Sequence, residues 1–140
     1  MNDKFFLDTN ILVYALSKAH QSKHVVASRL VDEAIDSGKG TISYQVVQEF
    51  FSVAFRRFSP PMSIAEAEQV LTVTLRPLLA VHSSYSLYGQ AFELARRYSL
   101  SWYDSLIVAA ALEAECRILY TGDLQHGQKF SDLRVLNPFL

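Results

Sequence analysis

Residues 4–12 have the sequence Lys-Phe-Phe-Leu-Asp-Thr-Asn-Ile-Leu, and this stretch decides the fold class. The short apolar run over residues 4–7 is typical of a buried strand. Asp8, Thr9 and Asn10 come next, which are residue types that start helices, and apolar residues then recur at helical spacing. The stretch therefore predicts a strand that leads directly into a helix, with Asp8 at the junction.

The rest of the chain repeats this alternation of short apolar runs and helical patterns. Gly38 ends the second predicted helix, and Ser59-Pro60-Pro61 ends the third. Ser43 is placed to cap the third helix, and Ser63 forms a capping-box pattern with Glu66 for the fourth. The expected helices start near residues 9, 23, 44, 64, 85 and 102. The expected strands cover residues 4–7, 40–43, 78–81, 117–120 and 134–136, the last at an edge of the sheet. This order predicts an α/β fold with short, mostly parallel strands.

Length and composition limit the classes of protein to consider. The chain has 140 residues, of which 50% are hydrophobic, so we expect one domain spanning residues 1–140. The chain has a formal net charge of -1, so it does not have the excess of basic residues that is typical of many nucleic-acid-binding proteins. The single cysteine, Cys116, excludes an intramolecular disulfide and a multi-thiolate metal centre. Because neither a signal-peptide pattern nor a membrane-length apolar run is present, we expect a cytoplasmic protein without a membrane partner.

Four acidic side chains occupy positions where an isolated negative charge is costly: Asp8, Glu49, Asp104 and Asp123. Asp8 and Asp123 each follow a predicted strand, and the carboxyl ends of parallel strands are the usual place for a ligand site. Asp104 opens an apolar helix, and Glu49 lies in the middle of an aromatic-rich one. Gathered acids repel one another, so they either take up protons or bind a cation. Oxygen ligands without a His or Cys cluster favour magnesium or manganese, which suits hydrolysis of phosphodiester bonds.

Each of these acids also has an ordinary structural explanation. Asp8 is a suitable N-cap for the first helix, and Asp104 follows Ser101 at the spacing of a capping box. Glu49 is placed to pair with an arginine two turns further along its helix, and Asp123 is a common turn residue after a glycine. Taken one at a time, the acids leave both explanations open.

Several other side chains are weaker candidates. Asn10 and Thr121 lie two residues from Asp8 and Asp123, where they would orient ligands. Trp102 and Tyr103 precede Asp104, where aromatic rings either stack on a splayed base or pack into the core. Basic residues either bind substrate phosphates or favour helix dipoles; they are Arg56, Arg57, Arg96, Arg97 and Lys129.

Four segments together resemble the PIN-domain family and, within it, the VapC-like toxins of bacterial toxin–antitoxin pairs. The likeness spans essentially the whole chain, and the segments occur in the order that is typical of the family. They are Phe-Leu-Asp-Thr-Asn-Ile-Leu at 6–12, Ser-Tyr-Gln-Val-Val-Gln-Glu-Phe at 43–50, Trp-Tyr-Asp-Ser-Leu-Ile at 102–107 and Tyr-Thr-Gly-Asp-Leu at 120–124. The resemblance implies a three-layer α/β/α PIN-like fold, with helices on both faces of a short, mostly parallel central sheet.

The resemblance also implies an activity and a site. Its acidic quartet, matched here by Asp8, Glu49, Asp104 and Asp123, binds Mg²⁺ or Mn²⁺ and hydrolyses RNA. The chain is thus expected to be a metal-dependent endoribonuclease and the toxin of a VapBC-like pair. Asn10 and Thr121 match the supporting polar positions of the family; they complete the candidate set.

The implied partners are RNA, a cognate VapB-like antitoxin and a second copy of the chain. In VapC-like proteins a C-terminal segment of the antitoxin typically lies along the toxin and blocks its site. The dimer is favoured by an aromatic-rich helix that has more apolar residues than one buried stripe needs, although a well-buried helix would explain it equally. Its aromatic residues are Phe50, Phe51, Phe55 and Phe58.

Two other functions compete with this interpretation. A haloacid-dehalogenase-like phosphatase would use Asp8 as a covalent nucleophile, but such enzymes need a second aspartate where Asn10 stands. A non-catalytic PIN module that binds RNA or protein would share the fold, because fold alone does not fix function. The presence of all four acids argues against the non-catalytic module.

Overall fold

Six short strands form one sheet in the order β3-β2-β1-β4-β6-β5 in the computed structural model, which describes residues 3–140. The strands are β1 (Phe5–Leu7), β2 (Gly40–Ser43), β3 (Leu79–Val81), β4 (Ile118–Tyr120), β5 (Lys129–Phe130) and β6 (Leu133–Leu136). All neighbouring pairs are parallel except β5 and β6, which are antiparallel. The prediction of an α/β fold with a mostly parallel sheet is confirmed.

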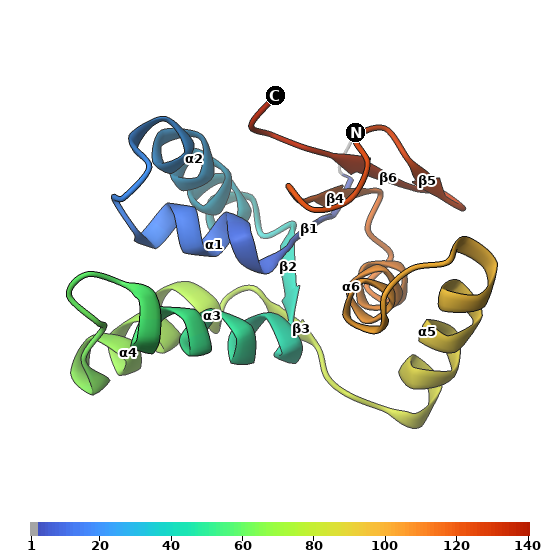
Figure 1. Ribbon diagram of the computed structural model, residues 1–140, viewed down its shortest axis with the longest axis horizontal. Helices are drawn as coiled ribbons and strands as arrows, with labels where there is room; N and C mark the ends of the chain where they lie inside the picture. Colours follow the sequence, from blue (N-terminus) through green and yellow to red (C-terminus); the bar gives the residue numbers. More distant parts are fainter. Residues whose placement is uncertain (1–2) are drawn as a thin grey trace.

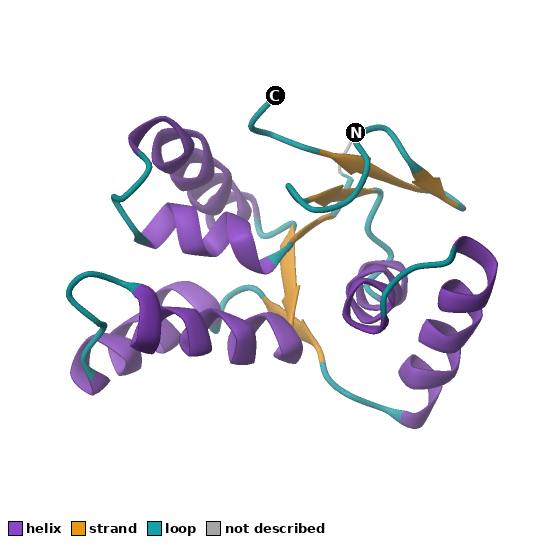
Figure 2. Ribbon diagram, viewed as in Figure 1, coloured by secondary structure: helices purple, strands orange, loops and turns teal. Residues whose placement is uncertain are grey.

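Helices cover both faces of this sheet and give it three layers. Helices α1 to α4 lie on one side, and α5 and α6 lie on the other (Figure 1). Figure 2 shows the strands in orange between the two groups of helices. The helices are α1 (Thr9–Leu16), α2 (Gln21–Ser37), α3 (Tyr44–Arg57), α4 (Ile64–Val70), the π-helix η1 (Leu71–Leu75), α5 (Tyr85–Tyr98) and α6 (Trp102–Glu113). Within residues 3–140, no helix is both long and apolar enough to span a bilayer.

The core is built around β1 and α6. All three residues of β1 are buried, which its position between β2 and β4 requires. In α6 the run from Ser105 to Ala111 is buried throughout, so this helix is covered by α5 as well as by the sheet. On the other side α2 packs closely on β2, because a Cβ at Gly40 would lie 2.1 Å from the Cβ of Ala34.

Three details differ from the sequence predictions. The strand predicted at the edge, over residues 134–136, is instead an inner strand, because the chain turns at Ser131 and β5 pairs outside β6. The fourth predicted helix changes from α4 to the π-helix η1 at Leu71. Ser43 is at the N-cap of α3, but its hydroxyl makes no capping bond. The capping box of Ser63 and Glu66 is confirmed.

Candidate active site

Asp8 lies where β1 ends and α1 begins, and both of its carboxylate oxygens accept hydrogen bonds. The backbone N–H of Thr9 donates to Oδ1 at 2.7 Å, which makes Asp8 the N-cap that its sequence position suggested. The Thr121 hydroxyl, at the end of β4, donates to Oδ2 at 2.8 Å. Because β1 and β4 are parallel neighbours, their carboxyl ends bring these residues together from positions 113 apart in the chain.

The environment of Asp8 makes its ionisation less favourable than in water. Burial is the largest cause and raises the pKa of Asp8 to about 6, since only 6% of the residue is exposed. The hydrogen bonds from Thr121 and Thr9 act in the opposite direction, and the negative charges of Asp123 and Glu49 raise the pKa further. Asp8 therefore combines a structural role as a cap with an electrostatic cost that a cap does not need.

Glu49, near the middle of α3, contacts the N-terminus of α1 through Thr9. The hydroxyl of Thr9 donates to Glu49 Oε1 at 2.7 Å, and Gln45 Nε2 donates to Oε2 at 3.3 Å. The alternative in which Glu49 pairs with an arginine two turns further along α3 is wrong for the described residues, because Arg56 bonds to Ser52 instead. Thr9 thus links Asp8 and Glu49, and sequence reasoning did not identify it as a site residue.

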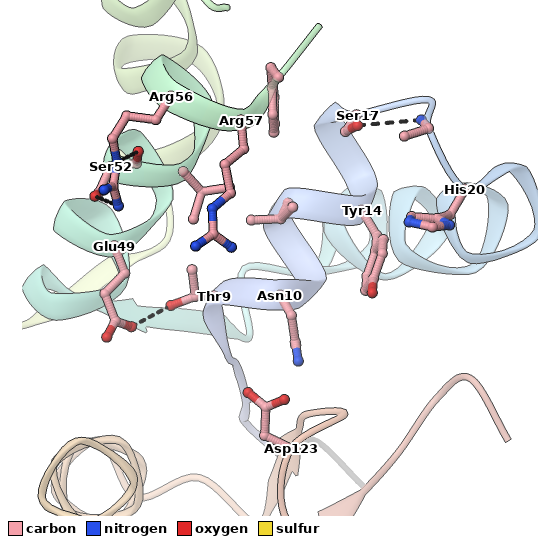
Figure 3. Close-up of a pocket in the computed structure, with 14 residues that line it drawn as sticks. Thr9, Asn10, Tyr14, Ser17, His20, Glu49, Ser52, Arg56, Arg57 and Asp123 are labelled. Atoms are coloured by element: carbon pink, nitrogen blue, oxygen red, sulfur yellow. Dashed lines mark hydrogen bonds between the residues drawn. The ribbon is translucent and has the colours of Figure 1, made fainter.

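Asp123 lies in the loop after β4 and is held by two neighbours. Its backbone N–H donates to the Thr121 hydroxyl at 3.0 Å, and Asn10 directs its side-chain amide toward the carboxylate (Figure 3). Burial is the main cause that raises the pKa of Asp123, followed by the charge of Asp104; the bond from Asn10 lowers it. Gly122 lies close to the same amide, because a Cβ added at Gly122 would lie 3.3 Å from Asn10 Nδ2.

Asp104 is half-buried in the first turn of α6, where the Ser101 hydroxyl accepts a hydrogen bond from its backbone N–H at 3.2 Å. The reciprocal bond of a capping box is not formed within the described part of the chain, so the side chain of Asp104 is not occupied as a cap. Its charge acts on Asp123, whose charge in turn acts on Asp8. The fold thus brings all four predicted acids into one electrostatic cluster.

The donor set suits a hard divalent cation that keeps part of its water shell. No three His, Cys, Asp or Glu side chains among residues 3–140 converge on one point, so the protein does not form a closed cage of carboxylates. Mg²⁺ typically binds to one or two carboxylates together with water and phosphate oxygens, which this open arrangement allows. The raised pKa values of Asp8 and Asp123 and the buried, unpartnered Oδ1 of Asn10 also fit a cation close by.

A cleft of about 550 Å³ runs from Asp123 and Glu49 between α1 and α3 (Figure 3). Arg57 lines the same cleft, where its side chain extends from α3 toward Thr9 (Figure 3), and it forms no hydrogen bond or ion pair with the described residues. Other arginines suggested as phosphate ligands are already engaged: Arg96 pairs with Glu93, and Arg97 lies over the Tyr98 ring at 5.4 Å. The cleft therefore combines acidic side chains with a guanidinium that has no partner among the described residues.

Comparisons with known proteins place this arrangement in a family. No curated protein resembles the chain closely enough in sequence to count as a match. A structure of a toxin–antitoxin complex from Klebsiella pneumoniae is similar, with a TM-score of 0.69, 19% identity and coverage of 96% of this chain and 98% of that one. VapC20 of Mycobacterium tuberculosis, described as a Sarcin-Ricin loop cleaving toxin, has a TM-score of 0.65, 21% identity and coverage of 86% and 92%.

VapBC2 of Rickettsia felis, solved with a DNA fragment from its promoter, has a TM-score of 0.60, 20% identity and coverage of 94% and 96%. At these identities the structures show a shared fold. The sequence itself matches the PIN domain over residues 5–130, which is most of its length. The chain therefore belongs to the PIN domain family.

Proposed function

We propose that this protein is a Mg²⁺- or Mn²⁺-dependent endoribonuclease and the toxin of a VapBC-like toxin–antitoxin pair. The observation that carries the proposal is the electrostatic cluster of Asp8, Glu49, Asp104 and Asp123, two of which, Glu49 and Asp123, line the same cleft as Arg57. Burial raises the pKa of Asp8 and of Asp123, and neighbouring negative charges raise both further. Such carboxylates are costly to maintain for structure alone, so a cation is the natural partner of the cluster.

Asp8, Asp104 and Asp123 would hold the cation, one or two of them directly and the rest through its water ligands, because no three of these side chains among residues 3–140 converge on one point. A bound divalent ion lowers the pKa of a water ligand and stabilises negative charge on phosphoryl oxygens. Thr121 and Thr9 fix the orientation of Asp8, and Asn10 holds Asp123 against it.

Glu49 and Arg57 have separate roles in the proposal. Glu49 Oε2, whose contact with Gln45 is long at 3.3 Å, is the oxygen best placed to accept a proton from an attacking water. The Arg57 guanidinium lines the cleft without a partner among the described residues, so it would bind a phosphate of the RNA chain. This local charge compensates for the weak overall charge of the chain.

Unpaired or looped RNA is the proposed substrate, and two protein partners accompany it. The similar structures include toxins in complex with antitoxins, which supports a small antitoxin that closes the cleft. A second copy would pack on the α3–α4 face, where Phe51 stacks on Phe55 beside the exposed side chains of Ile64 and Leu71. Sedimentation of wild type and Phe55→Asp would test this dimer, since only wild type should sediment as a dimer.

The phosphatase alternative conflicts with the surroundings of Asp8. Such an enzyme needs a second aspartate two residues after the nucleophile, but Asn10 stands there and directs its side-chain amide toward Asp123. A non-catalytic PIN module would not explain why four acidic side chains lie close together despite the electrostatic cost of their negative charges.

The test is RNA cleavage by purified protein with Mg²⁺ or Mn²⁺, with and without excess chelator. We expect cleavage with metal, none with chelator, and none by Asp8→Asn or Asp104→Asn. Asp132→Asn is a matched control, because this exposed acid precedes β6 at the opposite edge of the sheet and should cleave like wild type. Cleavage in excess chelator would refute the metal-dependent site, and a phosphorylated Asp8 trapped from a phosphate donor would favour the phosphatase.

A further inference from the structure

We propose that Gln45 is a positioning residue that holds the carboxylate of Glu49 and the helix turn of Asp104 in a fixed relation to each other. Gln45 lies in the first turn of α3, one turn before Glu49, and its side chain reaches α6. We call its two hydrogen bonds, to Glu49 and to Tyr103, the Gln45 bridge. The inference rests on the proposed function, because it assigns a role in the reaction to a residue that contacts the acidic cluster.

The side-chain amide of Gln45 donates both hydrogen bonds of the bridge. Its Nε2 lies 3.3 Å from Oε2 of Glu49 and 3.4 Å from the backbone carbonyl oxygen of Tyr103. An ionised carboxylate and a carbonyl group only accept hydrogen bonds, whereas an amide NH₂ group has two protons to donate. The two bonds can therefore form at the same time, and only the nitrogen side of the amide can make them.

The burial of Gln45 indicates that these bonds are the reason for its presence. The residue is only 7% exposed, whereas Gln48 on the same helix is exposed. The other buried side chains of α3 are the apolar Val46, Phe50 and Ala54. A buried amide is costly unless it is hydrogen-bonded, so packing alone would favour another apolar residue here. The groups that Gln45 joins explain a polar one.

The first bond of the bridge completes the fixation of Glu49. The Thr9 hydroxyl donates to Oε1 of this carboxylate at 2.7 Å, and Gln45 donates to Oε2. With a donor at each oxygen, the carboxylate group cannot rotate without losing a hydrogen bond. Each carboxylate oxygen can accept more than one hydrogen bond, so Oε2 keeps the capacity to accept a proton from water.

The second bond fixes the backbone that carries Asp104. The carbonyl of Tyr103 and the N–H of Asp104 belong to one peptide group. The N–H side of this group donates to the Ser101 hydroxyl at 3.2 Å, and the carbonyl side accepts from Gln45. The peptide group is thus held at both ends, although the carboxylate of Asp104 accepts no hydrogen bond from the described residues.

The bridge joins the two layers of helices that lie on opposite faces of the sheet. Glu49 belongs to α3 in one layer, and Asp104 belongs to α6 in the other (Figure 1). Glu49 is proposed to accept a proton from water, and Asp104 is proposed to hold the cation, so their separation affects the rate. A misplacement of about 1 Å can slow an enzyme by about a hundredfold. Gln45 reduces this freedom by bonding to both sides.

The kinetics of Gln45→Met give the first test, because methionine has a similar length and donates no hydrogen bond. We expect the kcat for cleavage of a single-stranded RNA with Mg²⁺ to fall by about tenfold, while the KM for the RNA changes by less than about twofold. Gln48→Met is the matched control, since this exposed residue of the same helix does not line the cleft and should leave both constants unchanged. Thermal denaturation establishes that each variant is folded at the assay temperature.

A double-mutant cycle tests whether Gln45 acts through Glu49. In a Glu49→Ala background the relation between the two acids no longer matters, so Gln45→Met should slow the residual cleavage by less than about twofold. A tenfold loss that persists in this background would overturn the positioning role. So would a loss in KM alone, or a kcat of folded Gln45→Met equal to that of wild type.

The NMR signals of the Gln45 side-chain NH₂ group separate this inference from the proposed function. They are identified by their absence in Gln45→Met, and we expect slow exchange with water and a shift on Glu49→Ala. If wild type cleaves no RNA with either metal, the nuclease proposal fails, and these two signs would still support the bridge. Signals that exchange as fast as those of Gln48, or that ignore Glu49→Ala, would overturn it. If wild type cleaves and Gln45→Met matches it, the nuclease stands and the bridge fails.

Discussion

Asp8 and Asp104 are both proposed metal ligands, but the fold holds them in opposite ways. Asp8 is buried at a strand end, and both oxygens accept hydrogen bonds from fixed donors. Asp104 is half-buried on α6, and its carboxylate accepts no hydrogen bond from the described residues. One half of the site is therefore built into the fold, while the other half can adjust to metal and substrate.

This difference separates the effect of each acid on stability from its effect on activity. Removing the charge of Asp8 relieves an electrostatic cost in the folded, metal-free protein. Removing the charge of Asp104 relieves less, because water already solvates part of it. If both acids bind metal, the two changes should harm activity equally and differ in stability.

The largest expected effect is on cleavage. Asp8→Asn and Asp104→Asn should each reduce the rate of RNA cleavage by about a thousandfold, because each removes a negative charge that binds the cation. Thermal denaturation in chelator should show that Asp8→Asn raises the melting temperature and that Asp104→Asn changes it little. Equal stabilisation by both variants would remove the distinction between the two halves.

The next effect is the pH dependence of stability without metal. The pKa of Asp8 is about 6 in the folded protein and has an ordinary value of 3.8. Protonated Asp8 therefore favours the folded state; this contribution is complete below pH 4 and is lost as the pH rises through 6. Urea denaturation should show a loss of about 3 kcal/mol over this range in wild type relative to Asp8→Asn. Parallel pH profiles for the two proteins would contradict the burial cost.

A smaller effect is expected at Thr121, which joins Asp8 to Asp123. The Thr121 hydroxyl donates to Asp8 and accepts from the backbone N–H of Asp123. Thr121→Val keeps the shape but removes both bonds, so the apparent affinity for Mn²⁺ in cleavage assays should fall by about tenfold or more. Thr121→Ser, which keeps the hydroxyl, should restore most of the affinity; failure of this rescue would indicate a packing effect instead.

The smallest effect is expected at Gly122. A Cβ there would lie 3.3 Å from Asn10 Nδ2, so Gly122→Ala should displace the amide that holds Asp123. We expect a loss of cleavage of only a few-fold, because Asp123 keeps its backbone bond to Thr121. Val73→Ala is a control, because this exposed side chain lies in η1 and does not line the cleft.

Sequence reasoning predicted the parts of this site that follow strand ends and failed where side chains meet across helices. Asp8 and Thr121 could be placed together because parallel strands end at a common edge. The bond from Thr9 to Glu49 joins residues 40 positions apart, and no local pattern specifies it. The β5–β6 hairpin was missed because the two residues of β5 are too few to give a periodic signal.

The central claim is that the acidic cluster activates water against an RNA phosphodiester, and the chemistry of the cut ends tests it most directly. A single-stranded RNA is cleaved with Mg²⁺ or Mn²⁺, alongside a copy with a 2′-deoxynucleotide at the cut. Attack by water predicts ends without a 2′,3′-cyclic phosphate, cleavage of the 2′-deoxy copy, and no cleavage in excess chelator. Cyclic phosphate ends, or cleavage that persists in chelator, would contradict the account.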